Sequence, residues 1–374
     1  MNTTDENLKM KPLESYHPFS KEVLELFERM KVTKQSEIHH AEGDVYVHTQ
    51  MVKAEVEKLP LSERAKMLLD WTAIFHDIAK PDTTVWEADQ YTGEFDWRAP
   101  KHAVYGEKMF RDLMWSNFNY KDREEIAGLI KYHGLSIWNE DKEDPDMSVI
   151  KASLRCNVED IATFAQCDFR GRICSDLEDC LFKIEFFKER AENLNCLTSP
   201  YQFTSDWARL HYFKNGDYPG KEIWEPEGGW VVLLCGLPGS GKNYWIERNW
   251  GGPVIELDAI RKQHKIKWDD KDAQGFVMQE AKELLKVNLR KKQDVLWNGT
   301  NMTEQQRATI IDIALEYRAK IKIVYIDCSI PDAIKRNRDR EEDKQVKNSV
   351  IEKYARKMEI PNLTECHVLE VVEN

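Results

Sequence analysis

A short glycine-rich segment between an apolar strand and a helix constrains this chain more than any other feature. The run Trp230–Cys235 is apolar throughout, and the segment after it, Gly236–Asn243, reads G-L-P-G-S-G-K-N. This matches the pattern G-x-x-x-x-G-K-[ST] between a strand and a helix, except that Asn243 stands where Ser or Thr is usual. Glycines let backbone N–H groups turn inward around phosphates, and the helix N-terminus adds partial positive charge. The segment predicts a phosphate-binding loop in an α/β domain.

We expect this loop to bind ATP, or another nucleoside triphosphate, together with Mg²⁺. Lys242 is placed to reach the β- and γ-phosphates. An amide oxygen of Asn243 can coordinate Mg²⁺ directly or through water. The sequence departs from the usual Mg²⁺-binding pattern at a second position. The third strand ends in Asn298, where an Asp often holds Mg²⁺ through water. The loop residues expected to bind the nucleotide are Gly236, Gly239, Ser240, Gly241, Lys242 and Asn243.

The hydrophobic pattern changes along the 374 residues and indicates two domains. From about 20 to 200 apolar residues recur at helical spacing. Beyond 230, continuous apolar strands alternate with helices, which is typical of a buried parallel sheet. Residues 214–229 hold Gly, Pro and charge without periodicity. We therefore expect an all-α domain at 1–213, a linker at 214–229 and an α/β domain with a parallel sheet at 230–374.

The pattern also predicts individual elements. The expected helices of the first domain are Val45–Leu59, Arg64–Ala79, Ala103–Trp115, Arg123–Tyr132, Met147–Phe169 and Glu178–Asn193, with a long loop at Pro81–Pro100. The expected strands of the second are Trp230–Cys235, Val254–Leu257, Val295–Trp297, Ile321–Ile326 and Val368–Val372, separated by helices Lys242–Asn249, Gln274–Lys291, Thr303–Lys320, Pro331–Arg338 and Val350–Met358.

Composition limits the function classes further. The net charge is −12, but residues 231–374 carry 25 basic and 23 acidic side chains, whereas residues 1–230 carry 29 and 43. The acidic half is a poor platform for a long phosphate backbone but can hold cations, and a compact site for a chain end is compatible with either half. No run is long and apolar enough for a membrane span, and the eight Cys form no C-x-x-C pair. We expect a cytoplasmic protein with reduced thiols.

Charged side chains near the ends of the later strands suggest phosphoryl transfer. Asp258 ends the second strand of the α/β domain, at the edge that faces the ligand in a parallel sheet. A carboxylate there can accept a proton from an acceptor hydroxyl, and Arg261 one turn later can pair with a phosphate. Arg336 and Arg340 lie four residues apart, which would place them on one helix face, where they can close over the nucleotide.

A second set of residues predicts a metal site in the helical domain. The pair His76-Asp77 ends a predicted helix, and the gaps between the candidates His48, His76, His102, His133 and Asp168 are 28, 26, 31 and 35 residues. Each gap fits one helix plus a loop, so the side chains come from different helices that converge on one cavity. Imidazoles with carboxylates suit divalent Mn, Fe, Co, Ni or Zn. A lone histidine is more often an ordinary core or surface residue than a metal ligand. The metal-site interpretation therefore depends on the whole set of residues.

Residues 230–345 carry the glycine-rich loop, then D-x-x-R, then R-N-x-x-R. In this order the three motifs make the segment similar to the 5′-OH polynucleotide kinases. The resemblance implies that Lys242 holds the ATP phosphates and Asp258 is the general base on the 5′-OH. It implies that Arg261 holds the acceptor's 3′-side phosphate and that Arg336 and Arg340 form a lid. Arg307 looks like a further element of that family, without an assigned role.

The order H…HD…H…H…D over residues 48–168 resembles the HD-domain metal-dependent phosphohydrolases. The resemblance implies two divalent metals, with Asp77 bridging them. Lys80, one turn after His76-Asp77, would neutralise substrate phosphate, and Arg172 is a weaker candidate of the same kind. The implied ligands of one metal are His48, His76, Asp77 and Asp168, and those that complete the second are His102 and His133.

The whole chain resembles the bacterial HD-Pnk family of end-healing enzymes. Supporting strings are Glu42-Gly-Asp-Val-Tyr-Val-His48, Phe75-His76-Asp77-Ile-Ala-Lys80 and Asp168-Phe-Arg-Gly-Arg172. The resemblance implies removal of a 2′,3′-cyclic, 2′- or 3′-phosphate by the first domain and phosphorylation of a 5′-OH by the second. The implied partners are RNA or DNA ends and a separate ligase, with no membrane.

Two other functions fit the same residues. One is an HD nucleotidase fused to a nucleoside or small-metabolite kinase. The other is a nucleotide-sensing switch, in which Asn243 prevents Mg²⁺-dependent turnover.

Overall fold

The computed structural model describes residues 10–88, 93–224, 228–267, 270, 272–341 and 345–374. The chain forms two compact units, one up to Gln202 and one from Phe203 onward, and each is described by itself. The linker expected at 214–229 includes residues 225–227, which lie outside the described residues. The expected domain boundaries stay predictions. No described helix has the length and apolar character needed to cross a membrane.

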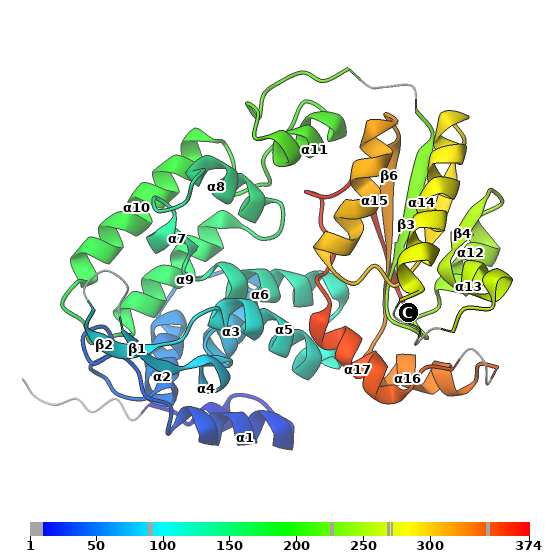
Figure 1. Cartoon of the computed structure of the whole chain (residues 1–374). Helices are drawn as coiled ribbons and strands as arrows, with labels where there is room; N and C mark the ends of the chain where they lie inside the picture. The colour runs from blue at the N-terminus through cyan, green and yellow to red at the C-terminus, as the bar shows by residue number, and fades with distance from the viewer. Residues whose placement is uncertain (1–9, 89–92, 225–227, 268–269, 271, 342–344) are drawn as a thin grey trace, which may run out of the picture. The chain divides into compact units, whose positions relative to one another are not determined.

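The first unit is built from helices, as the 3.6-residue pattern predicts (Figure 1). Helix α3 lies at its centre and packs against α2, α6 and α9. The buried side chains of these four helices form one continuous hydrophobic core. The helices are α1 (Lys21–Met30), α2 (Val45–Glu57), α3 (Glu63–Phe75), α4 (Lys80–Thr83), α5 (His102–Met114), α6 (Tyr120–Tyr132), α7 (Leu135–Trp138), α8 (Pro145–Ser153), α9 (Val158–Arg170) and α10 (Leu177–Asn193).

Polar caps fix where the central helices begin. The side chain of Asp44 accepts a hydrogen bond from the N–H of Val47 at 2.9 Å, so α2 begins at Val45. Ser62 and Asn119 cap α3 and α6 in the same way. Such caps satisfy N–H groups that have no partner within the helix. The helix starts therefore set the positions of all side chains that follow along each helix.

Two predictions for this unit are wrong. The expected loop Pro81–Pro100 contains helix α4 and an antiparallel hairpin of β1 (Val85–Ala88) and β2 (Phe95–Arg98). Trp86 and Trp97 face each other across this hairpin, and such aromatic cross-strand pairs stabilise a two-stranded sheet. Residues 89–92 of the expected loop lie outside the described residues.

The expected single helix Met147–Phe169 is also two helices. Helix α8 ends at Ser153 and α9 begins at Val158. The side chain of Asn157 accepts a hydrogen bond from the N–H of Glu159 at 2.9 Å, which makes a new helix start in the middle of the apolar pattern. Apolar spacing alone does not reveal this interruption, because both helices present apolar faces to the same core.

The second unit contains a five-stranded parallel sheet among its described residues, and the expected α/β class is confirmed. The strand order is β4-β5-β3-β6-β7. The strands are β3 (Trp230–Cys235), β4 (Val254–Glu256), β5 (Val295–Asn298), β6 (Lys320–Asp327) and β7 (Val368–Glu373). The helices are α11 (Asp206–Asn215), α12 (Lys242–Asn249), α13 (Leu257–His264), α14 (Gln274–Arg290), α15 (Glu304–Glu316), α16 (Ile330–Arg338) and α17 (Asn348–Lys357).

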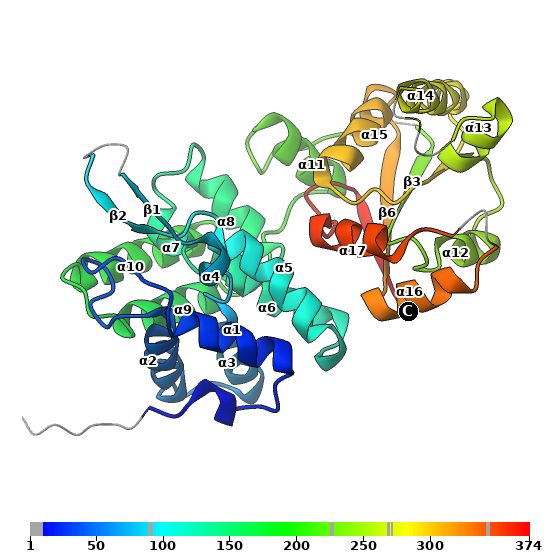
Figure 2. The same ribbon diagram turned by 60° about the horizontal axis from the view of Figure 1, so that its bottom comes forward.

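Helices cover both faces of this sheet. Figure 2 shows α14 and α15 on one face, with α12 and α16 on the other. On the face of α12, Trp245 packs against Val232 and Leu234 of β3 and against Val324 and Ile326 of β6. Strands buried on both faces explain the continuous apolar runs of the sequence.

The central strand β3 positions the glycine-rich loop. The chain leaves β3 towards β4 and β5 on one side and later crosses to β6 and β7 on the other, so the strand order reverses at β3. In open α/β sheets ligands bind at such a reversal, beyond the carboxyl ends of the strands. The loop after Cys235 lies at this place.

Candidate functional site

The structure brings together all six side chains of the predicted metal set in the first unit. His48 comes from the first turn of α2 and Asp168 from the last turn of α9. His76 and Asp77 directly follow α3. His102 is the first residue of α5, and His133 directly follows α6. The side chains are buried except for that of His102, which is 24% exposed.

Four imidazole Nε2 atoms and two carboxylates meet in this cluster. The Nε2 atom of His48 lies 3.0 Å from Oδ1 of Asp168 and 3.3 Å from Nε2 of His76. The Nε2 atom of His102 lies 3.2 Å from Nε2 of His133. The two histidine pairs therefore form two adjacent groups of potential ligand atoms.

Asp77 joins these two groups. Its Oδ2 atom lies 3.2 Å from Nε2 of His76 and 3.6 Å from Nε2 of His48, whereas its Oδ1 atom lies 3.5 Å from Nε2 of His102. Each oxygen thus faces a different histidine pair. Both oxygens are buried; the ammonium group of Lys80 pairs with Oδ2 at 2.8 Å, whereas Oδ1 accepts no hydrogen bond from the described residues. A buried carboxylate is costly unless cations face it, and Lys80 supplies one on the Oδ2 side only.

Backbone carbonyls fix the tautomers of three histidines. The Nδ1 atoms of His76, His102 and His133 lie 2.9, 2.7 and 2.8 Å from the carbonyl oxygens of Ala73, Ala99 and Ile130. A carbonyl can only accept, so each Nδ1 carries a proton, and in the neutral ring Nε2 then has the lone pair that faces the cluster. This is the arrangement that a metal-binding histidine requires.

The pKa shifts of Asp77 and His133 also favour metal binding by the cluster. Burial alone would raise the pKa of Asp77, but His76, Lys80 and His102 hold it well below its usual value. Burial and the charges of neighbouring histidines lower the pKa of His133 to about 3. The carboxylate is therefore charged and this imidazole neutral at pH 7. The donor set of imidazoles and carboxylates, with Oδ1 of Asp77 buried and unpaired among the described residues, fits two divalent transition metals.

Side chains around the cluster orient its members. Oε1 of the buried Glu42 lies 3.0 Å from Nδ1 of His48 and 2.8 Å from Nδ1 of His40. The ammonium group of Lys80 lies 2.8 Å from Oδ2 of Asp77. Arg172 pairs with Asp168, with Nη2 and Oδ2 2.5 Å apart. Sequence reasoning noted Glu42 only as part of a supporting string, because its contact with His40 and His48 depends on the fold of the loop before α2.

The glycine-rich loop of the second unit has the geometry of a phosphate site. Gly236, Gly239 and Gly241 have φ values of 153°, 84° and 107°, which other residues rarely adopt. A Cβ on Gly239 would lie 2.3 Å from the carbonyl oxygen of Ala333, so the loop packs closely against α16. The Nζ atom of Lys242 donates to the carbonyl oxygens of Gly236 and Leu237 at 2.9 and 2.8 Å.

A carboxylate that sequence reasoning missed lies beside the two expected Mg²⁺ positions. Nδ2 of Asn298 donates to Oδ1 of Asn243 at 3.2 Å and to Oε1 of Glu256 at 2.7 Å. Glu256 is the last residue of β4, at the same sheet edge as Asn298 of β5. Its position at a strand end was the available signal. The three side chains together could hold a hard cation through oxygen atoms.

Asp258 and Arg261 form a pair in α13. The prediction that Asp258 ends the second strand is wrong, because β4 ends at Glu256 and Asp258 lies in the first turn of α13. Its side chain is 90% exposed. The Nη1 atom of Arg261 lies 2.5 Å from Oδ1 of Asp258, and Nε of Arg261 donates to Oε1 of Gln274 at 2.8 Å. The guanidinium group is thus held next to an exposed carboxylate.

The two arginines of the expected lid differ from the prediction. Nη1 of Arg336 in α16 donates to the carbonyl oxygen of Ser240 at 3.3 Å, so it contacts the glycine-rich loop. Helix α16 ends at Arg338, and Arg340 therefore does not share a helix face with Arg336. The charge of Arg340 nevertheless acts on Lys242 of the glycine-rich loop. Burial is the main cause of the lowered pKa of Lys242, at about 8, and Arg340 adds to the lowering.

Arg307 has a structural role in the second unit. It is fully buried, and its Nε and Nη2 atoms donate to the two oxygens of Glu365 at 2.7 and 3.0 Å. Its Nη1 atom donates to the carbonyl oxygens of Asn301 and Glu359. Arg307 therefore ties the loop after β5 to the segment before β7.

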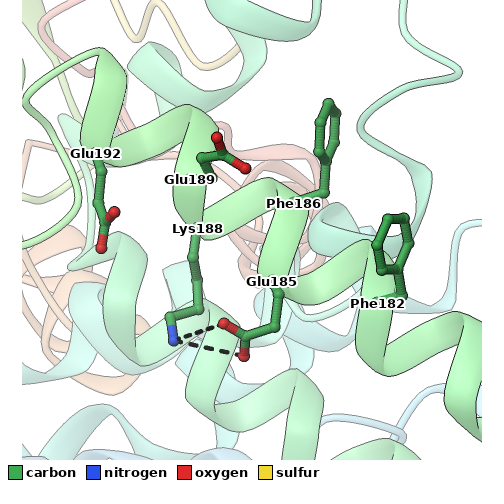
Figure 3. A pocket seen from close by; sticks show the side chains of 6 residues that line it. All are labelled: Phe182, Glu185, Phe186, Lys188, Glu189 and Glu192. Carbon is green, nitrogen blue, oxygen red and sulfur yellow. Dashed lines mark hydrogen bonds and ion pairs between the residues drawn. The ribbon is translucent and has the colours of Figure 1, made fainter.

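A surface hollow lies elsewhere, along α10 (Figure 3). All six labelled side chains come from this one helix, and Lys188 pairs with Glu185. The hollow includes none of the predicted site residues. Its lining is Phe182, Glu185, Phe186, Lys188, Glu189 and Glu192.

Comparison with known proteins separates the same two parts. A model of the HD domain matches residues 21–160, and a model of the AAA domain matches residues 231–361. The L-seryl-tRNA(Sec) kinase of Methanococcus maripaludis is 24% identical over 139 residues, which cover 35% of this chain and 53% of that protein. The chain thus spans about half the length of this curated relative.

Solved structures resemble parts of the chain. A chain of the Pnkp1/Rnl/Hen1 RNA repair complex is 19% identical, with a TM-score of 0.33, covering 38% of this chain and 46% of that one. A gluconokinase from Sinorhizobium meliloti is 19% identical, with a TM-score of 0.28, covering 39% of this chain and 82% of that one.

The family models and the geometry agree on the domain types. The chain joins a helical HD domain to an α/β P-loop domain of the kinase type, and this combination indicates an enzyme. The expected fold class is confirmed. The P-loop and the His/Asp cluster indicate a nucleotide and divalent metals.

Proposed function

We propose that this protein heals broken RNA or DNA ends with two activities. The P-loop domain phosphorylates a 5′-OH with ATP, and the HD domain removes a 2′,3′-cyclic, 2′- or 3′-phosphate from the other end. The observation that carries the proposal is that two distinct phosphate-chemistry sites occur in one chain. One is the cluster around Asp77, and the other is the loop around Lys242.

In the kinase half, positioning and charge supply the catalysis. Lys242 and the backbone N–H groups of the loop bind the ATP phosphates. The carboxylate of Asp258 accepts the proton of the 5′-OH, and Arg261 binds the acceptor phosphate on the 3′ side. Asn243, Asn298 and Glu256 would hold Mg²⁺, while Arg336 and Arg340 neutralise charge on the transferring phosphoryl group.

In the HD half, His48, His76, Asp77 and Asp168 would hold one divalent metal, and Asp77, His102 and His133 would hold the second. When bound, two such ions supply an activated water and stabilise the attacking and leaving oxygens. Lys80 neutralises the substrate phosphate. Arg172 positions Asp168 through their ion pair rather than binding substrate.

The exposure of Asp258 supports a large acceptor. Its side chain is 90% exposed at the start of α13, so the proposed base faces open solvent rather than an enclosed cavity. An acceptor that projects from a polynucleotide end can reach such a carboxylate. A small-metabolite kinase usually encloses its acceptor in a concave site. This observation favours the end-healing activity over a nucleoside or metabolite kinase.

One oligonucleotide tests both halves. It carries a 5′-OH and a 2′,3′-cyclic phosphate, and it is incubated with labelled ATP, Mg²⁺ and Mn²⁺. We expect gain of a 5′-phosphate and loss of the terminal phosphate. Asp258→Asn should abolish only the first change and Asp77→Asn only the second, whereas Asp179→Asn, at an exposed position of α10, should alter neither.

The outcomes separate the alternatives. Turnover of free nucleosides or nucleotides without any change in the oligonucleotide would favour the fused nucleotidase and metabolite kinase. ATP binding without transfer to any acceptor would favour the nucleotide-sensing switch. Loss of both activities in a single folded variant would contradict two separate sites.

A further inference from the structure

An exposed aromatic ring lies next to the proposed acceptor site of the kinase half. Phe276, in the first turn of α14, is 51% exposed. Its ring centroid lies 4.9 Å from that of His264, in an edge-to-face arrangement. This contact supports the phenyl ring, while half of the residue stays open to solvent. Single exposed aromatic residues are normal on protein surfaces, so the surroundings decide whether this one can bind a ligand.

Contacts between α13 and α14 place Phe276 close to Arg261. The two helices lie side by side (Figure 2). Nε of Arg261 donates to Oε1 of Gln274 at 2.8 Å, and Gln274 precedes Phe276 by two residues. His264, which contacts the ring, follows Arg261 by three residues, and residues at this spacing are neighbours on a helix surface. The ring therefore lies beside the guanidinium group that is proposed to bind the acceptor phosphate.

The order of side chains along α13 gives this neighbourhood a direction. Asp258, Arg261 and His264 lie at intervals of three residues, so His264 is about 9 Å beyond Asp258 along the helix axis, with Arg261 midway. In the proposed kinase reaction Asp258 faces the 5′-OH, and Arg261 binds the phosphate on the 3′ side of the first nucleotide. A strand that continues in this direction brings its second nucleotide to His264 and Phe276.

The charge around the ring suits a phosphate backbone. Residues 259–268 include no acidic residue. Glu280 is already paired with His264, with Oε2 and Nε2 2.8 Å apart. Aromatic rings beside cationic side chains bind single-stranded nucleic acid with little sequence preference, because every base has a face that can stack. The exposed cationic side chains of this segment are Lys262, Lys265 and Lys267.

We propose that Phe276, supported by His264, forms a base-stacking subsite for the second nucleotide of a single-stranded 5′-OH acceptor. The subsite rests on the proposed kinase activity and deepens it, because it defines the acceptor as a strand of at least two nucleotides. The second base stacks on Phe276 while Arg261 binds the phosphate that links the first two nucleotides. Stacking needs only a flat base, so the subsite accepts all bases.

Oligonucleotide binding without turnover tests the subsite. The full chain is saturated with ADP and Mg²⁺, and a short single-stranded 5′-OH oligonucleotide, labelled at its 3′ end, is titrated by fluorescence anisotropy. We expect Phe276→Ala to weaken binding about five- to fiftyfold, because the stacking of one base on the ring is lost. Phe276→Trp should bind at least as tightly as the wild type, because it keeps an aromatic face.

A second oligonucleotide, with an abasic second nucleotide, identifies the base that stacks. The wild type should bind it more weakly than the intact strand by a similar factor, whereas Phe276→Ala should bind both strands equally. This cycle isolates the contact between the ring and the base. Phe182→Ala is the matched control, because Phe182 is 73% exposed on α10 of the other unit, and it should bind like the wild type. In kinase assays Phe276→Ala should raise KM for the oligonucleotide more than it lowers kcat.

Each result decides the proposal. No binding by the wild type, or equal affinities of Phe276→Ala and wild type, would overturn the subsite even if 5′-OH ends are phosphorylated. A full abasic penalty in Phe276→Ala would also overturn it, because the base would then bind elsewhere. If Phe276→Ala fails to fold, Phe276→Leu decides, since it keeps an apolar side chain without a ring. Base-dependent binding through Phe276, without phosphorylation of any 5′-OH, would support the subsite and contradict the proposed kinase activity instead.

Discussion

Replacement of Glu42 by glutamine tests how the loop before α2 orients the histidine cluster. The two oxygens of Glu42 face three donors. Oε1 lies 2.8 Å from Nδ1 of His40 and 3.0 Å from Nδ1 of His48, and Oε2 accepts from the N–H of Ile173 at 2.9 Å. The glutamate side chain is 1% exposed, so water cannot replace these contacts.

The size of the effect follows from the number of acceptors. Glutamine offers one acceptor oxygen, and its NH₂ group must face at least one of the three donors. A buried donor left without an acceptor costs about 1–3 kcal/mol. The carbonyl oxygen of Gly171, 3.2 Å from Nδ1 of His48, offers a partial substitute. We therefore expect the free energy of unfolding to fall by about 1–2 kcal/mol. Metal affinity should weaken about tenfold, near the lower end of the range for partners of metal-bound histidines.

Competition between the protein and a chromogenic chelator for Mn²⁺ or Zn²⁺ measures the affinity, and chemical denaturation measures the stability. Glu25→Gln is the control, because Glu25 lies on the surface of α1 in an exposed pair with Lys21. It should change neither quantity appreciably. Wild-type metal affinity and stability in Glu42→Gln would refute the idea that this carboxylate positions His48.

Three other predictions concern the second unit. Gly239→Ala should abolish binding of a fluorescent ATP analogue and leave the metal content unchanged, because its Cβ would lie 2.3 Å from the carbonyl oxygen of Ala333; ATP binding at wild-type strength would contradict the close packing. Burial lowers the pKa of Lys242 to about 8, so ATP binding at pH 9 should take up a proton as the ammonium group reforms. Calorimetry in two buffers of different ionisation enthalpy detects this uptake, and identical heats would argue against it. Arg307→Ala leaves the buried Glu365 without its partner and should lower the free energy of unfolding by about 3–5 kcal/mol in denaturant titrations; a loss below about 1 kcal/mol would show that the pair is dispensable.

The fold class was predictable from the sequence because its signals are local. Continuous apolar strands between helices indicate a buried parallel sheet wherever they occur. The glycine-rich loop needs only its neighbours, Cys235 before it and Lys242 after it, to be recognised. The hairpin of β1 and β2 escaped prediction because its strands are short and its stability depends on Trp86 facing Trp97.

The surroundings of the candidate sites were not predictable in the same way. Glu42 and Gln35 act through partners that the fold brings near, such as His48 and Lys80. Arg307 and Glu365 meet across 58 residues of chain. No spacing rule reports such contacts, because they depend on how complete helices and strands pack.

The loop between α1 and α2 places several contacts of the cluster within a few residues of chain. Gln35 faces Lys80, Glu42 faces His48, and Asp44 sets the first residue of the helix that carries His48. An inserted or deleted residue there would shift all three contacts together, whereas a point substitution can alter one of them. In protein engineering the loop between α1 and α2 is therefore best replaced as one segment. Its length must be conserved in any library, while its side chains can be varied to retune the site.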